Sequence, residues 1–165
     1  MEQPEPTWPA AEITLRPIGW VSCPRVELLD DHWGDVPSVI HLDADRFGPE
    51  ALAGLSDFSH LEVVFHFHRV PDEAIETGAR HPRGNPDWPR VGIFAQRGKN
   101  RPNRLAVSRC SIEQVDNLTI HVRGLDAIDH TPVLDLKPYL TEFAPRGQLH
   151  QPPWSTALMT NYYTP

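Results

Sequence analysis

The chain has 165 residues, 39% of them hydrophobic and 22% charged, which suits one folded domain with a sizeable core. Its 18 prolines disfavour long helices, and no apolar run approaches the length of a membrane helix. Two cysteines are too few for a disulfide framework, and a formal charge of -7 argues against a polyanionic partner unless the basic residues are segregated.

The first half of the chain predicts short strands and one helix. Residues 1–11 are rich in Pro and Glu and are expected to form a flexible arm. Their lack of a basic region followed by an apolar one predicts no signal peptide and a cytoplasmic protein. Short strands are predicted at 12–22 and 39–42, and apolar residues at roughly helical spacing predict a helix over 43–55.

The strongest strand signal covers residues 61–70, where Phe65 and Phe67 alternate with His66 and His68. A long polar loop with several prolines follows. The second half predicts a buried strand at 91–95, a hairpin of 105–115 and 118–125 joined by Asp116 and Asn117, a strand at 132–139 and a wrapping tail.

Many short strands with at most one or two short helices predict a mostly-β barrel or sandwich. A doubly wound α/β fold would need several amphipathic helices, and the sequence lacks them. It also lacks the glycine-rich motifs of Rossmann and P-loop nucleotide sites.

Positive charge is concentrated in residues 80–109, which hold eight of the fifteen Lys and Arg residues and a single acid, Asp87. Four cations fall within residues 97–104, and nearby carboxylates or an anionic partner must offset their mutual repulsion. Asp30 with Asp31, and Asp126 with Asp129, are candidates to answer part of it. The basic loop is therefore the first candidate for a functional site.

Other chemistry is less favoured. Two histidines at a spacing of two, His66 and His68, more often line a polar barrel face than bind a metal, and no metal is expected. The chain has no G-x-S-x-G elbow that would indicate a serine hydrolase.

The stretch GIFAQRGKNRPNRLAVS (92–108) resembles the G-[VI]-F-A-T-R-S-x-x-R-P-N-P-I-G-x-S signature of the TsaA-like family. Residues 54–60 (GLSDFSH), 65–68 (FHFH) and 125–139 (LDAIDHTPVLDLKPY) are similar to the other blocks of that family, in the same order. The family includes the TrmO-type tRNA methyltransferases, which use S-adenosylmethionine to methylate N6 of threonylcarbamoyl-adenosine at position 37.

The resemblance implies a small, single-domain β-barrel outside the Rossmann class, over residues 12–145, with 146–165 as a tail packing on it. It also implies a cytoplasmic homodimer that binds S-adenosylmethionine, with tRNA as substrate. The cofactor residues it implies are Trp33, Gly34, His68, Arg69, Arg97, Leu105, Val107, Leu125, Asp126, Ala127 and Ile128. The substrate residues expected in the basic loop are Lys99, Asn100, Arg101, Asn103 and Arg104.

The sequence departs from the family signature at five positions: Gln96, Gly98, Arg104, Ala106 and His130. The extra C-terminal domain of longer bacterial members is not expected. The departures leave two alternatives open: a methyltransferase of a small metabolite, or an S-adenosylmethionine-binding module without turnover. Asp129 and Lys137 are the candidates for a catalytic base, between which the sequence does not decide.

Overall fold

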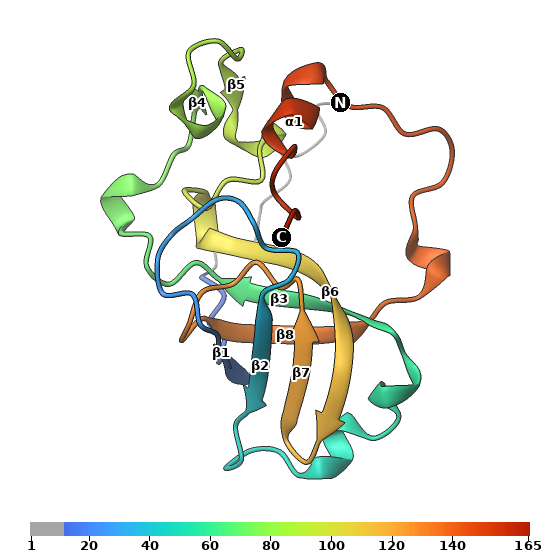
Figure 1. Ribbon diagram of the computed structural model, residues 1–165. Helices are drawn as coiled ribbons and strands as arrows, with labels where there is room; N and C mark the ends of the chain where they lie inside the picture. The colour runs from blue at the N-terminus through green and yellow to red at the C-terminus, as the bar shows by residue number, and fades with distance from the viewer. Residues whose placement is uncertain (1–11) are drawn as a thin grey trace, which may run out of the picture.

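The computed structural model describes residues 12–165, and its centre is a closed antiparallel barrel (Figure 1). Its strand order is β1-β2-β7-β6-β3-β8, and pairing of β1 with β8 closes the ring. The mostly-β barrel expected for this chain is confirmed, while the arm expected at 1–11 lies outside the described residues. The barrel strands are β1 (Gly19–Ser22), β2 (Pro37–Leu42), β3 (His60–His66), β6 (Leu105–Asp116), β7 (Thr119–Arg123) and β8 (Pro132–Pro138).

Strand β3 shows how alternation builds the core. Leu61, Val63 and Phe65 are at most 2% exposed, while the residues between them are only half-buried. A barrel this small has no room for a channel, so inward side chains fill it. The other strands supply the matching inward residues: Val21, Ile40, Leu42, Cys110, Ile120, Val122 and Val133.

The predicted hairpin is confirmed as β6 and β7. Asp116 pairs with Thr119, so the connecting turn consists of Asn117 and Leu118. Asn117 has a φ of 51°, a left-handed conformation that asparagine adopts more readily than most residues. The Thr119 hydroxyl donates a hydrogen bond of 2.8 Å to the Asp116 carbonyl and closes the turn.

The helix predicted over 43–55 is wrong. This region contains two short 3₁₀ turns, η1 (Pro49–Leu52) and η2 (Leu55–Asp57). Pro49 disfavours helical geometry in the residue before it, and Gly54 has a φ of 82°, so neither side can extend into a longer helix. The apolar residues of this stretch instead join the barrel core: Leu52 belongs to it, and Phe47 packs against it.

The strand predicted at 91–95 is mostly wrong. Strand β5 covers only Val91–Gly92 and pairs with β4 (Ala79–Arg80) in a small separate sheet, and a 3₁₀ turn, η5 (Ile93–Ala95), follows. The buried amide of Gln96 donates hydrogen bonds to the carbonyls of Arg80 (3.1 Å) and Val91 (2.9 Å). Side-chain amide bonds therefore brace this segment in place of a longer ladder.

The chain returns to the barrel at its C-terminal end. After η7 (Thr141–Phe143) comes an exposed stretch, then the helix α1 (Pro153–Leu158), beside the β4–β5 sheet in Figure 1. Two further turns of 3₁₀ type, η3 (Asp72–Ala74) and η4 (Pro82–Gly84), lie in the proline-rich loop, and η6 (Pro102–Arg104) precedes β6. Among residues 12–165, every helix is too short to span a bilayer.

Candidate cofactor site

Arg97 is placed against the start of β6. Its guanidinium donates a hydrogen bond of 2.7 Å to the carbonyl of Val107 and remains exposed. The side chains of Leu105 and Val107 point out of the barrel, with 38% and 44% of their surface exposed. Three of the expected cofactor residues therefore form one surface, with a fixed cation at its edge.

A second group comes from the loop before β2. Trp33 is 3% exposed, and the Arg25 guanidinium lies 4.3 Å from its ring centroid. At Gly34 a Cβ atom would come within 2.0 Å of the Tyr163 carbonyl oxygen, so only glycine allows the two segments to approach so closely. The loop is thus held by a cation–π contact on one side and by the C-terminal segment on the other.

Asp126 follows β7 and lies at the centre of the arrangement. One of its carboxylate oxygens accepts a hydrogen bond from the Tyr162 hydroxyl, and the other is buried without a hydrogen-bond partner among the described residues. Burial and then the negative charge of Asp126 raise the pKa of Tyr162 and of Tyr163, while the charge of Arg97 opposes the rise at both. Arg97, Asp126 and the two tyrosines thus act on one another electrostatically.

The residues around Asp126 offer only backbone groups to a ligand. Leu125, Ala127 and Ile128 are at most 6% exposed, and the first two belong to the barrel core. Their side chains hold the loop rigidly to the barrel. Their peptide groups remain the atoms by which this segment could recognise a ligand, as in many cofactor sites.

His68 and Arg69 follow β3 and lie near the start of β6, because Phe67 and Val70 on either side of them bond to Arg104. Arg69 donates a hydrogen bond of 2.6 Å to the carbonyl of Val26. Burial and then the Arg69 cation lower the pKa of His68, and His66 and His130 contribute in the same direction. The loop of residues 23–36 therefore contacts this pair as well as the C-terminal segment.

The two candidate bases are placed very differently. Asp129 accepts a hydrogen bond of 3.0 Å from the backbone N–H of Cys23, and its other oxygen is 3.3 Å from His130. Lys137 is an exposed residue of β8 that pairs with Asp135 and lies beside Glu62 of β3, away from the residues described above. Of the two, Asp129 is the one in the same loop as Asp126.

Most polar side chains of residues 97–104 make contacts within the folded chain. Lys99 lies 3.7 Å from Asp30, and Arg104 lies 2.9 Å from Asp72 and donates to the carbonyl of Val70. Asp30 therefore pairs with one of these cations, as predicted, whereas Asp126 and Asp129 make other contacts. Asn100 donates to the carbonyl of Ala74, and Asn103 is exposed.

Arg97 and Arg101 differ from their neighbours. Arg101 donates a hydrogen bond of 2.8 Å to the carbonyl of Gln96. Within the described part of the chain, neither guanidinium lies within 4 Å of a carboxylate oxygen. Their charges therefore remain for an anionic ligand.

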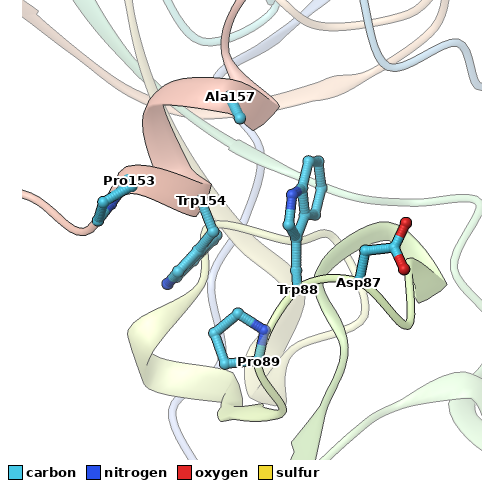
Figure 2. A pocket seen from close by; sticks show the side chains of 6 residues that line it. All are labelled: Asp87, Trp88, Pro89, Pro153, Trp154 and Ala157. Carbon is cyan, nitrogen blue, oxygen red and sulfur yellow. The ribbon is translucent and has the colours of Figure 1, made fainter.

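An aromatic cleft lies between α1 and residues 87–89, which are part of the basic segment of residues 80–109 (Figure 2). It has a volume of about 430 Å³ and is lined by Trp88 and Trp154, with Pro89, Pro153, Ala157 and Asp87 around them. Its lining residues come from α1 and from the loop that follows η4, so these two segments lie close together.

No local sequence pattern indicates the roles of Tyr162, Tyr163 or Trp154. Thirty-six positions separate Tyr162 from Asp126, so only the folded chain brings them together. Among residues 12–165, no three His, Cys, Asp or Glu side chains gather as a metal ion would require.

The fold is a closed six-stranded barrel, with the partly buried Asp126 after β7 and the exposed Arg97 before β6. These features define a small β-barrel protein with a candidate site for a polar ligand. Residues 25–144 match the family model described as "tRNA-methyltransferase O N-terminal domain". The chain belongs to this family.

Relatives of known name agree with that assignment. The chain is 33% identical over 115 residues to a tRNA (adenine(37)-N6)-methyltransferase of Homo sapiens, covering 70% of this chain and 26% of the relative. The enzyme of the same name from Escherichia coli is 37% identical over 107 residues, with 61% and 44% covered. A probable S-adenosyl-L-methionine-binding protein of Methanothermobacter thermautotrophicus is 31% identical over 141 residues, with 82% and 96% covered. The matched region is thus less than half of the human and bacterial enzymes.

The fold is also that of solved TrmO structures. A crystal structure of TrmO from Pseudomonas aeruginosa superposes with a TM-score of 0.71 at 24% identity, covering 89% of this chain and 63% of that one. A second TrmO structure from Pseudomonas aeruginosa gives 0.68 at 26% identity, with 84% and 61% covered. The barrel and much of the surrounding chain therefore share one architecture.

Proposed function

We propose that this protein is an S-adenosylmethionine-dependent methyltransferase that acts on N6 of an adenosine in tRNA, with threonylcarbamoyl-adenosine 37 as the target. The human and Escherichia coli relatives are named as tRNA (adenine(37)-N6)-methyltransferases. The observation that carries the proposal is the convergence of Arg97, Asp126 and the Trp33 loop on one face of the barrel.

The residues at this face suit the proposed cofactor. Arg97 offers a charged donor for the methionyl carboxylate, and the buried, half-satisfied carboxylate of Asp126 suits ribose hydroxyls. The peptide groups of residues 125–128 and the apolar surface of Val107 are suited to adenine. When bound, S-adenosylmethionine supplies a methyl group on a sulfonium centre.

The chain's contribution to the transfer is mainly positioning. Methyl transfer needs donor and acceptor nitrogen held in line, and a base only if the nitrogen must lose a proton in the same step. Asp129 is the better placed candidate for such a base, because it shares the Asp126 loop and Lys137 does not. One Asp129 oxygen accepts a hydrogen bond from the Cys23 N–H, so the proton would go to the other oxygen, which lies beside His130.

The basic loop is the proposed tRNA surface. Arg101 and Asn103 are the least committed to internal contacts, while Lys99, Asn100 and Arg104 hold the loop to the fold. Phosphate contacts from such residues supply affinity with little sequence preference. The cytoplasmic location and the homodimer are part of the same proposal, and sedimentation at several concentrations tests the second.

One alternative has an observation in its favour. The Methanothermobacter relative, 96% of which is covered by the match, is named only as a probable S-adenosyl-L-methionine-binding protein. A binding module without turnover would bind the cofactor equally well. It would form no S-adenosylhomocysteine with any tRNA lacking the modification, whereas the proposed enzyme would.

Calorimetric titration of S-adenosylmethionine into wild type and Arg97→Ala tests the cofactor site. We expect micromolar binding, about -8 kcal/mol, and a loss of roughly tenfold or more in the variant, since a charge-assisted contact is removed. Arg146→Ala is the matched control, because Arg146 lies in the exposed stretch before α1. Absence of binding to wild type would rule out the proposed cofactor.

A further inference from the structure

Residues 161–164 lie across the loop that precedes β2, and we call them the C-terminal strap. The backbone N–H of His32 donates to the Asn161 carbonyl at 3.0 Å, and that of Trp33 donates to the Tyr162 carbonyl at 2.8 Å. The His32 ring and the Thr164 hydroxyl lie 3.0 Å apart. Figure 1 shows this end of the chain running between the β2 loop and β6. The strap therefore covers peptide groups at the candidate cofactor site.

The strap also covers the carboxylate of Asp126. The Tyr162 hydroxyl donates to one oxygen, and the second oxygen is buried beneath it without a partner in residues 12–165. A tyrosine hydroxyl carries its proton at neutral pH, and burial raises the pKa of Tyr162 further, so this hydroxyl is the donor to Asp126. Because one oxygen is bonded to Tyr162 and the other is buried, a ligand that binds Asp126 must displace the strap.

The contact has the chemistry of a nucleoside. A carboxylate that accepts a hydrogen bond from a hydroxyl is the arrangement by which proteins commonly hold a ribose. We infer that the Tyr162 hydroxyl occupies the place of a ribose hydroxyl on Asp126, and that the strap must open before S-adenosylmethionine binds. This inference rests on the proposed function, because it places the cofactor's ribose at Asp126.

The structure allows the strap to move without unfolding the barrel. The strap is held by the polar contacts above and by the close approach of Tyr163 to Gly34, while Asn161, Tyr163 and Thr164 are exposed. Upstream of the strap, Trp154 of α1 and Trp88 line the aromatic cleft (Figure 2). Opening can therefore take place after α1, with the helix left in position.

The test is titration of S-adenosylmethionine into wild type, Tyr162→Phe and the control Tyr139→Phe. Tyr162→Phe keeps the ring and removes the donor, so the strap loses its bond to Asp126. We expect Tyr162→Phe to bind roughly tenfold more tightly than wild type, the size of effect expected for a hydrogen bond to a charged group. Tyr139, which packs under Arg109 on β6, should leave the affinity unchanged. Unchanged or weaker binding by Tyr162→Phe overturns the inference.

Hydrogen exchange gives an independent readout. The amides of His32 and Trp33 are protected by the strap, so saturating S-adenosylmethionine should speed their exchange. If their exchange slows instead, the strap closes over the cofactor and does not compete with it. If neither wild type nor Tyr162→Phe binds S-adenosylmethionine, both the proposed function and the inference fail. Binding to wild type with no change in Tyr162→Phe rejects the inference alone.

Discussion

The two cysteines of this chain occupy different environments, which makes them separable by chemistry. Cys110 lies in the barrel core, is 3% exposed and has a pKa raised to about 12, first by burial and then by the charge of Asp126. Cys23 follows β1 and is only half-buried. Because the thiolate is the reactive form, at pH 8 we expect iodoacetamide to label Cys23 at least tenfold faster than Cys110.

Peptide mass spectrometry over a time course measures the two labelling rates. Denaturant serves as the control, since unfolding should bring the rates close together. Comparable rates in the folded protein would contradict the burial of Cys110 in the core.

At the scale of elements, the junction of β1 and β2 depends on a close backbone approach at Gly19. A Cβ atom there would lie 2.0 Å from the His41 carbonyl oxygen, at the end of the β1–β2 pairing where Gly19 pairs with Leu42. We expect Gly19→Ala to lower the free energy of unfolding by roughly 1–3 kcal/mol, as overpacking does elsewhere. Urea denaturation measures the loss.

Gly92→Ala is the matched control for that change. Gly92 lies in β5 with extended backbone angles, and nothing lies within 4 Å of a Cβ built on it. Its substitution should change the free energy of unfolding by no more than about 0.5 kcal/mol. Equal unfolding midpoints for the two variants would show that the strands can separate at Gly19 without cost.

Elements whose signal is local were predicted well from the sequence. The alternation of Leu61, Val63 and Phe65 and the turn at Asn117 gave β3 and the β6–β7 hairpin correctly, because period-two burial and turn chemistry act over a few residues. The helix expected over 43–55 does not form, because Pro49 and Gly54 interrupt the stretch that has apolar residues at roughly helical spacing.

The candidate site was predictable only in part. The family resemblance pointed to Arg97, Asp126 and Gly34, which the fold brings to one face. Tyr162 could not be found in this way, because its contact with Asp126 joins the tail to the loop after β7 and no local pattern encodes it. Pairing of Lys99 with Asp30 is likewise a property of the folded chain.

At the scale of the whole molecule, the chain carries a formal charge of -7, although its residues 80–109 form a basic segment with eight Lys and Arg residues and one acid. Within that segment, Arg83 pairs with Asp31 and Arg104 with Asp72, so the charge available to a partner is smaller than the sequence suggests. The molecule can therefore bind a polyanion at one face while its remaining surface repels it. Such binding should be strongly salt-dependent.

This arrangement predicts how tRNA affinity should respond to salt. Arg101→Ala removes a cation that has no carboxylate partner among the described residues, so we expect weaker binding and a slope of log K against log salt that is shallower by about 1. Arg16→Ala is the control, because Arg16 pairs with Asp43 at the hairpin end of the barrel, away from the start of β6. Filter binding between 50 and 200 mM salt, roughly the range over which phosphate contacts weaken, measures both slopes. If the two variants shift the slope equally, the molecule's overall charge governs binding, and residues 97–104 are not the tRNA surface.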